Sequence, residues 1–270
     1  MSNTIFPKII HQIWGMWDDS DMPPDWKKAQ QKWKNMYSDY EYILWGRKNS
    51  LNLIETKYPQ YLDMYNNFEY PIQRADFIRY CILQTYGGIY VDLDIVPEKK
   101  FTDETFSGTN SDVYLMKGNN FLNYTYVIVI TNSLMISKKN SIFWDYVMEE
   151  VEKRYNKPKW KWIGKHTKVL QTTGPIMLTH VLDIYPKCVT LLPSNISLCS
   201  VCDYAKGIKK IKNSYIKPIK GMSWTGYDTT ILNFLLCNFQ KIIIFLLICL
   251  VIFIFFFYKY RSCCKNNKCK

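Results

Sequence analysis

An uncharged apolar run, Ile242–Tyr258, most limits what this chain can fold into. It is apolar on every face of a helix, which a soluble core does not require, and its length is close to the roughly 20 residues of one bilayer crossing. Basic residues follow it at once, as they do at the end of a membrane span. We therefore expect a folded domain over residues 1–230, an anchor with one C-terminal transmembrane helix over 231–258, and a basic tail over 259–270.

The net charge of +12 is partly local, because five of the basic residues stand in the tail. Positive charge tends to stay cytosolic, which places the tail in the cytosol. Glycosylation sequons at Asn123 and Asn195 favour a lumenal domain, whereas an N-terminus without a visible signal favours insertion after synthesis and a cytosolic domain. We expect a single-pass protein of a Golgi- or ER-like endomembrane, and the sequence leaves the side of the domain open.

Nucleic acid is not an expected partner, because no compact basic helix or zinc-finger spacing accompanies the charge. The nine cysteines follow no metal-binding pattern either. Cys199 and Cys202 form one CxxC motif, but no second pair and no histidine complete a zinc site. A disulfide within the group Cys188, Cys199 and Cys202 suits a lumenal domain, although nothing in the sequence requires it.

Strand-like and helix-like patterns alternate along the folded part, which predicts an α/β domain. Gly87 and Gly88 end one helix and give a tight turn into the next strand. Strands are expected at 6–14, 40–45, 89–93, 126–130 and 134–136. Helices are expected at 25–37, 51–65 with an interruption at Pro59, 73–86 and 142–154.

Two acidic residues, Asp92 and Asp94, stand at the carboxyl end of the apolar strand expected at 89–93. Strand alternation would direct both carboxylates to one face and Leu93 to the core. Paired carboxylates at the mouth of an α/β sheet are suitable ligands for Mg²⁺ or Mn²⁺, and such a cation neutralises a leaving diphosphate. Taken alone, an Asp-x-Asp pattern is most often two solvated acids.

The helix before that strand adds a further carboxylate and a guanidinium. Asp76 and Arg79 are three residues apart and share a helix face, with Arg74 and Tyr80 close by. The carboxylate suits sugar hydroxyls and the guanidinium suits phosphate. A surface ion pair is the commoner fate of such residues, so only the combination with the two aspartates, in this order and spacing, is specific.

Further motifs extend this pattern along most of residues 7–228. The stretches concerned are Pro7–Trp14, Arg74–Asp76, Arg79–Tyr80, Tyr86–Tyr90, Asp92–Asp94, Thr131–Ser133, Ser137 with Phe143–Trp144, Thr172–Pro175, and Gly221–Trp224 with Asp228. With them the chain resembles the family-32 glycosyltransferases, whose sugar-binding region contains a DXD motif. The likeness is greatest to mannosyltransferases that act on inositol phosphorylceramide and to initiating α-1,6-mannosyltransferases.

The resemblance implies a single Rossmann-like GT-A domain, a nucleotide-sugar donor, Mn²⁺ or Mg²⁺, and transfer with retention at the anomeric carbon. It also implies roles for individual residues. Trp14 would stack near the base, and Asp76 and Arg79 would hold the sugar and phosphate of the donor. Asp92 would contact the ribose or a water molecule on the metal, and Asp94 would bind the metal directly.

Other residues are implied around the same donor. Ser223 and Trp224 would close over the diphosphate. His11 and Arg74 are further candidates for donor binding, although a histidine at a strand end is more often structural. The stretch Thr172–Pro175 would line the acceptor side or form a turn.

The chain departs from the family pattern near its closing motif. A histidine is expected close to Ser223 and Trp224, but Thr225 follows them and lysines precede them. Asp228 is therefore the substitute candidate for the C-terminal metal contact. Lys217 and Lys220 would instead offer positive charge to phosphate, in which case the need for a metal would be weaker.

We therefore predict a membrane-bound hexosyltransferase that transfers mannose from GDP-mannose to a lipid resembling inositol phosphorylceramide, or to a glycan. One alternative is an enzyme of the same fold that uses a UDP-sugar. Another is a non-catalytic, sugar-binding membrane protein, against which the intact set of Asp76, Arg79, Asp92 and Asp94 argues. No second carboxylate can be assigned as a nucleophile, so front-face and double displacement both stay open.

Overall fold

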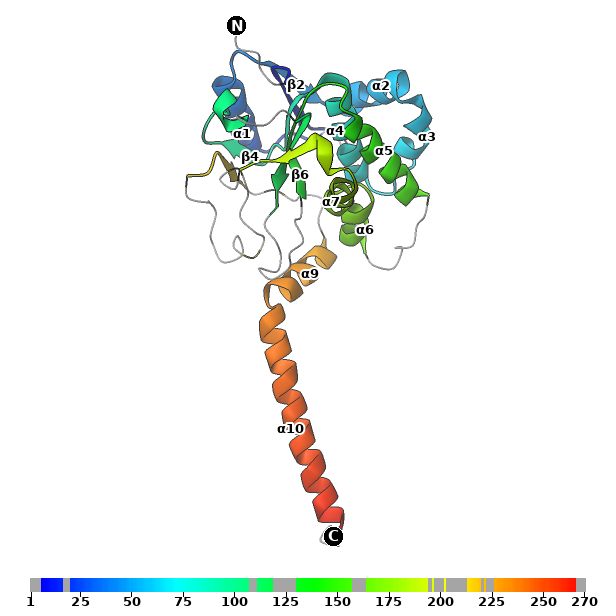
Figure 1. The fold of residues 1–270 in the computed structure, drawn as a ribbon, viewed down its shortest axis with the longest axis vertical. Helices are drawn as coiled ribbons and strands as arrows, with labels where there is room; N and C mark the ends of the chain where they lie inside the picture. The colour runs from blue at the N-terminus through cyan, green and yellow to red at the C-terminus, as the bar shows by residue number, and fades with distance from the viewer. Residues whose placement is uncertain are drawn as a thin grey trace.

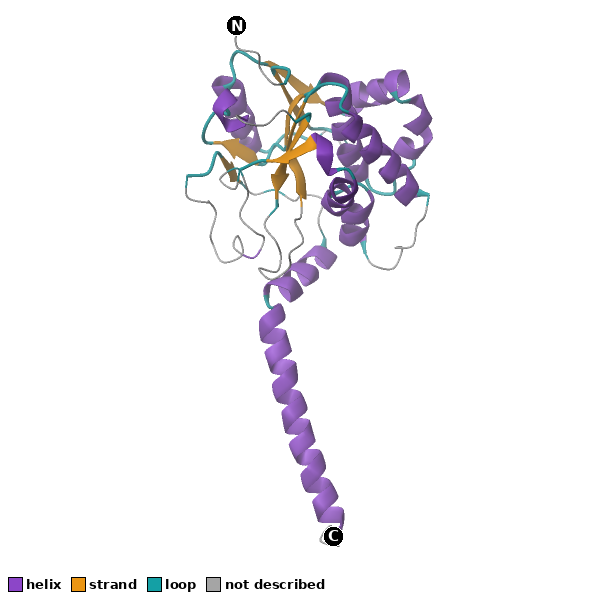
Figure 2. Ribbon diagram, in the orientation of Figure 1, coloured by secondary structure: helices purple, strands orange, loops and turns teal. Residues whose placement is uncertain are grey.

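The computed structural model describes residues 6–16, 20–106, 111–118, 130–156, 164–193, 196, 202, 213–219, 221 and 226–265. One α/β domain stands at the end of a long helix that extends away from it (Figure 1). Helices and strands mix throughout the domain, as Figure 2 shows, and the expected α/β class is confirmed.

The domain is built on a six-stranded sheet with the order β2-β1-β3-β6-β5-β7. Strands β2, β1 and β3 are parallel, β6 is antiparallel to both β3 and β5, and β7 is parallel to β5. Because β1, β2 and β3 are parallel, their carboxyl ends meet at one edge of the sheet. The strands are β1 (Ile9–Ile13), β2 (Glu41–Trp45), β3 (Gly88–Val91), β5 (Val113–Lys117), β6 (Ile130–Ser137) and β7 (Val189–Leu191).

Helices cover both faces of this sheet. On one face α1 packs beside β4, with Trp33 and Tyr37 buried among strand residues. On the other face a larger apolar cluster joins the remaining helices of the domain to the sheet. The helices are α1 (Pro24–Met36), α2 (Arg47–Lys57), α3 (Leu62–Asn66), α4 (Pro71–Tyr86), α5 (Ile142–Tyr155), α6 (Lys165–Thr172) and α7 (Pro175–Ile184), with short 3-10 turns at 59–61, 103–106 and 186–188.

Helix α4 is the most deeply buried of these, and it leads directly into β3. It begins with Pro71, whose fixed φ suits a first helical position. It ends at Tyr86, and the next two residues are Gly87, with a φ of +65°, and Gly88, with a φ of +91°. A Cβ at Gly87 would lie 2.7 Å from the Lys139 nitrogen, and one at Gly88 would lie 2.6 Å from the Ile9 oxygen. The two glycines thus make the tight turn expected from the sequence.

A second, two-stranded sheet pairs β4 (Ile95–Pro97) with β8 (Ile216–Pro218) in an antiparallel sense. Its pairing continues to Ile219, whose N–H donates to the Asp94 carbonyl oxygen at 2.8 Å. The late segment around residue 219 is therefore held beside the turn that contains Asp92 and Asp94.

The C-terminal part consists of α9 (Tyr227–Cys237) and α10 (Phe239–Lys265). Within α10, residues Phe239–Arg261 have a mean hydropathy of 3.0 and none of the span is buried, so it is long and apolar enough to cross a membrane. Helix α9 lies between the domain and α10 (Figure 1). The boundary expected at residue 230 falls inside α9.

Two residues of α9 are fixed to the domain, whereas several apolar side chains of the helix are exposed. Asp228 accepts a hydrogen bond from the backbone N–H of His166, and the Thr229 hydroxyl lies 2.9 Å from Nδ1 of His166. The exposed apolar side chains are Tyr227 (92 % exposed), Ile231 (60 %), Phe234 (63 %) and Leu235 (47 %).

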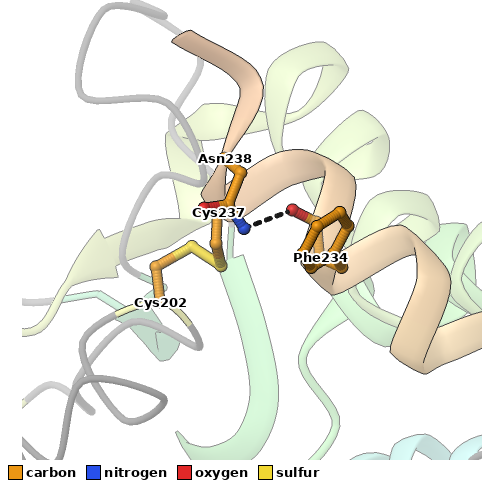
Figure 3. Close-up of a disulfide and its surroundings, with 4 residues drawn as sticks. All are labelled: Cys202, Phe234, Cys237 and Asn238. Carbon is orange, nitrogen blue, oxygen red and sulfur yellow. Dashed lines mark hydrogen bonds between the residues drawn. A yellow bond between two sulfur atoms is a disulfide. The ribbon is translucent and has the colours of Figure 1, made fainter. Parts of the chain in front are cut away.

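A disulfide joins Cys202 to Cys237 at the end of α9 (Figure 3). The disulfide considered within the group Cys188, Cys199 and Cys202 is therefore wrong for Cys202, because its partner comes from α9. Cys188 is a free, half-buried thiol. Cys199 lies outside the described residues, and so does Asn195.

Candidate functional site

A cavity opens at the carboxyl edge of the parallel strands, where the chemistry expected from the sequence gathers. Trp14 follows β1, and Asp92 and Asp94 follow β3. Helix α4 contributes Asp76 and Arg79. The remaining lining residues are Ile13, Gly15, Met16, Trp26, Ile72, Ala75, Tyr90, Leu93, Asn132, Val169, Leu170 and Pro175.

Arg79 connects the carboxylates of Asp76 and Asp92. Its Nη2 lies 3.1 Å from Asp76 Oδ1, and its Nη1 lies 3.4 Å from Asp92 Oδ1. Nη1 also donates to the Asn132 carbonyl oxygen at 2.8 Å. Because Arg79 and Asp76 are both buried, removing either would leave the other without its charge partner, which typically costs about 3–5 kcal/mol. The i,i+3 spacing on α4 is thus a buried ion pair and not a surface one.

Asp76 is further held by two donors from different elements. Asn132 Nδ2 donates to Oδ1 at 3.0 Å, and the Thr173 hydroxyl donates to Oδ2 at 3.0 Å. Burial raises the pKa of Asp76 to about 6, and the Arg79 charge opposes that shift. Asn132 and Thr173 belong to motifs that supported the resemblance, but their contact with Asp76 could not be predicted because both lie far from Asp76 in the chain.

Asp92 and Asp94 lie in a turn, since β3 ends at Val91 and β4 begins at Ile95. The argument from strand alternation is therefore wrong for these two residues. Both nevertheless line the cavity. Burial raises the pKa of Asp94 to about 7, and the nearby charge of Asp92 adds to the shift. Burial also raises the pKa of Asp92, which Arg79 opposes.

A divalent cation fits this pair of carboxylates. Two desolvated carboxylates that disfavour each other's ionisation are stabilised by positive charge, and their oxygens are the ligands that Mg²⁺ and Mn²⁺ prefer. Among the residues that the structure describes, no group of three or more His, Cys, Asp or Glu side chains is placed to hold a metal. The remaining ligands would therefore come from water and from phosphate oxygens, as is usual for Mg²⁺.

Tyr90 is a site residue that sequence reasoning missed. Its hydroxyl donates to Asp92 Oδ1 at 2.6 Å, and the Arg79 guanidinium lies over its ring at 4.8 Å. Its place in the sequence could have indicated this role, because Tyr90 stands two residues before Asp92. Trp26 was also missed, because its helical spacing indicated only an apolar face. Its ring packs edge-to-face against the ring of Trp14, with 5.5 Å between the ring centroids, and the two side chains give the cavity an aromatic wall.

The closing motif is described only at its first residue. A Cβ placed on Gly221 would clash with the Asp94 carboxylate, so the backbone there packs directly on that side chain. Ser223, Trp224 and Lys220 lie outside the described residues. Lys217 lies in β8 and is not among the residues that line the cavity.

Three candidates for donor or metal binding are not at this cavity. His11 is buried in β1, where Nδ1 accepts a hydrogen bond from Trp45 Nε1, so Nε2 donates to the Gly87 carbonyl oxygen. Both ring nitrogens are therefore used, and burial lowers the pKa of His11 to about 4. The assignment of His11 to donor binding is corrected to a structural role.

Arg74 and Asp228 are the other two. Arg74 lines a separate, neighbouring cavity and donates from Nη1 to the Phe68 carbonyl oxygen at 3.2 Å. The oxygens of Asp228 accept from the backbone N–H groups of His166 and Thr229, which lowers the pKa of its carboxyl group. Asp228 thus caps the first turn of α6 instead of replacing the missing histidine at the metal.

Comparison with known proteins places these motifs among glycosyltransferases. Residues 23–112 match the family described as "Glycosyltransferase sugar-binding region containing DXD motif". The chain is 33 % identical over 225 residues to mannosyl phosphorylinositol ceramide synthase CSH1 of Saccharomyces cerevisiae. The aligned region is 83 % of this chain and 54 % of that relative. It is also 30 % identical over 231 residues to inositol phosphoceramide mannosyltransferase 2 of Schizosaccharomyces pombe. Here the aligned region is 84 % of this chain and 61 % of that relative.

This chain thus spans little more than half the length of these relatives. Among solved structures, the PaToxG glycosyltransferase matches with a TM-score of 0.47 and 17 % identity, over 67 % of this chain and 70 % of that one.

Proposed function

Because this chain carries a glycosyltransferase sugar-binding region with a DXD motif and is related to inositol phosphoceramide mannosyltransferases, we propose that it is a glycosyltransferase. It transfers mannose from GDP-mannose, with retention, to a lipid acceptor that resembles inositol phosphorylceramide. The observation that carries the proposal is the buried network of Asp76, Arg79 and Asp92, which ends beside Asp94 in one cavity.

The geometry suits the charge that develops when a sugar leaves a diphosphate. Asp92 and Asp94 would hold Mn²⁺ or Mg²⁺, which supplies positive charge to the leaving diphosphate. Arg79 is fixed by two carboxylates and a backbone carbonyl group, so its charge is pre-organised and needs no rearrangement during the reaction. Asp76 is held by three donors and lines the cavity, where its carboxylate would accept hydrogen bonds from hydroxyl groups of the sugar.

The aromatic wall of Trp14 and Trp26 supports binding of the base. Ring faces beside a cavity provide a stacking surface at little entropic cost. The lining combines the charged side chains of the network with the aromatic wall and with apolar residues such as Ile72 and Ala75, so the cavity offers both charged and apolar groups to one ligand.

Helix α10 anchors the protein in a Golgi- or ER-like membrane as a single-pass span. Its length and hydropathy support this proposal. The disulfide between Cys202 and Cys237 supports a lumenal domain, because disulfides persist in oxidising compartments. The basic residues after the span would then face the cytosol.

The proposal is tested with the full chain in detergent micelles, since a truncation at residue 230 would divide α9 and remove Cys237. The purified protein is screened against GDP-mannose, UDP-glucose, UDP-galactose and UDP-N-acetylglucosamine, with dispersed inositol phosphorylceramide and Mn²⁺. Asp94→Asn should lower transfer by about a thousandfold, because it removes charge without changing size.

Asp183→Asn, an exposed change on α7, is the matched control and should retain full activity. Transfer from a UDP-sugar alone would replace the mannose assignment. Binding of a nucleotide sugar without hydrolysis or transfer by the unaltered chain would favour a non-catalytic sugar-binding protein.

A further inference from the structure

A second cavity lies beside the first, and two arginine side chains line it. Arg47 is the first residue of α2, and Arg74 stands in the first turn of α4. The cavity holds about 370 Å³. Met16 lines both cavities, so the two are neighbours. The other lining residues are Leu51, Tyr65, Asn66 and Pro71.

The charges of these two arginines are not balanced within the part of the chain that the structure describes. There, Arg79 pairs with Asp76 and Asp92, and Arg154 pairs with Glu150. No such ion pair to a described carboxylate involves Arg47 or Arg74, and the described lining of their cavity includes no Asp or Glu. Arg74 uses one of its five N–H groups on the Phe68 carbonyl oxygen.

The position in the fold relates this cavity to the proposed reaction. Arg47 follows β2 as Trp14 follows β1 and Asp92 follows β3, and these three strands are adjacent and parallel. The second cavity is thus the next site along the same edge of the sheet. Helices α2 and α4 both begin there, so the partial positive charge of two helix N-termini adds to the two guanidinium groups.

We propose that Arg47 and Arg74 bind the phosphate group of an anionic phosphodiester acceptor, and that they place its sugar-like head group next to the donor in the first cavity. This inference rests on the proposed function and extends it to the acceptor side of the site. Guanidinium groups match phosphate oxygens in pairs, and two unpaired ones at one cavity provide both charge and geometry. Met16 and Leu51 provide an apolar wall for the carbon skeleton.

Direct binding tests the site without requiring transfer. The full chain is placed in nanodiscs of neutral phosphatidylcholine, and glycerophosphoinositol is titrated as a soluble phosphodiester probe by calorimetry. Arg47→Gln and Arg74→Gln should each weaken its binding about tenfold, as expected for the loss of charge-assisted hydrogen bonds. Arg47→Lys and Arg74→Lys should recover part of the loss, because they keep the charge but not the paired geometry.

Lys48→Gln is the matched control. Lys48 is exposed, is adjacent to Arg47 and does not line the cavity. Its substitution by Gln removes one positive charge from the same helix end, as Arg47→Gln does. It should leave binding unchanged. Myo-inositol, which lacks the phosphate, should bind the unaltered chain and the arginine variants equally. An equal effect of Lys48→Gln, or no binding of the probe to the unaltered chain, would overturn the assignment.

Steady-state kinetics then separates the acceptor from the donor diphosphate as the source of the phosphate. With inositol phosphorylceramide as acceptor, the arginine variants should raise the acceptor KM about tenfold and leave the KM for the nucleotide sugar unchanged. A raised donor KM with an unchanged acceptor KM would show that the arginines serve the donor instead. Probe binding that depends on the arginines, in a chain without any transfer activity, would contradict the proposed function and leave the phosphate site standing.

Discussion

The Tyr90 hydroxyl donates a hydrogen bond of 2.6 Å to Oδ1 of Asp92, the same oxygen that faces Arg79. One oxygen of Asp92, a residue that lines the cavity, is thereby held within the protein. Tyr90 is buried in β3, so the strand fixes the position of this hydrogen-bond donor.

Tyr90→Phe should therefore lower transfer without unfolding the domain. The ring and its contact with Arg79 are kept, and only the donor to Asp92 is lost, which typically corresponds to a roughly tenfold effect. The measurement is kcat/KM at saturating Mn²⁺ together with the concentration of Mn²⁺ that gives half-maximal rate. Tyr114→Phe, a buried tyrosine of β5 away from the cavity, should leave both quantities unaltered.

Gly221→Ala should abolish transfer while the domain remains folded. A methyl group there would overlap the Asp94 carboxylate, so either the segment or the carboxylate has to move. At Gly226 an added methyl group would lie 3.3 Å from Asp228 Oδ1, which is tight but requires only a small shift. Gly226→Ala is therefore the control and should retain activity. Full activity of Gly221→Ala, with an unchanged Mn²⁺ requirement, would contradict the placement of this segment.

Acid should destabilise the domain through His11. Burial lowers the pKa of His11 from 6.5 to about 4, so the folded protein keeps the ring neutral where the unfolded chain takes up a proton. The unfolded state then binds more protons, and stability is lost as the pH falls from 6.5 toward 4, by roughly 3 kcal/mol in total at about 1.4 kcal/mol per pH unit.

Denaturant unfolding of the full chain in detergent at several pH values measures this loss. His11→Gln should be less stable at neutral pH but should show a smaller decrease between pH 6.5 and 4. His166→Gln serves as the comparison, because burial lowers the pKa of His166 as well. This variant separates the contribution of His166 to the acid dependence from that of His11. An equal acid dependence of the His11→Gln variant and the unaltered chain would exclude His11 as its origin.

The cysteine pairing has a direct test by mass spectrometry. Non-reducing peptide mapping should find Cys202 linked to Cys237 and should find Cys188 as a free thiol. The bond joins residues 35 apart in sequence, and closing a loop of that length stabilises a fold by about 2–4 kcal/mol. Cys237→Ser should lower the unfolding temperature accordingly, whereas Cys188→Ser should have little effect. A Cys188–Cys202 peptide would contradict the structure.

The sequence predicted well where local patterns decide the structure. The expected helix at 73–86 is α4 (Pro71–Tyr86), and the expected strand at 40–45 is β2, because both have strong apolar patterns and clear end signals. The helix expected at 51–65 begins earlier, at Arg47, since Gly46 N donates to Asn49 Oδ1 and caps the helix start. The break at Pro59 is confirmed as a 3-10 turn. The strand expected at 126–130 lies almost entirely outside the described residues.

The site was harder to predict where contacts join distant parts of the chain. Asp76, Arg79, Asp92 and Asp94 were found because they are close in sequence. Thr173 contacts Asp76 across 97 residues, and no periodicity reports such a contact. Arg74 was grouped with Asp76 because the two are only two residues apart in the chain, but helix positions i and i+2 face different directions, and Arg74 lines another cavity.

Helix α6 has contacts on two sides that together join the cavity to α9. Its residues Val169 and Leu170 line the cavity, while His166 at its start is held by Asp228 and Thr229 of α9. No flexible linker separates the cavity wall from the apolar helix, because α9 continues almost directly into α10. In the proposed membrane-anchored enzyme, this side-chain packing would set the distance from the cavity to a lipid head group, and a longer connection before α10 would increase that distance.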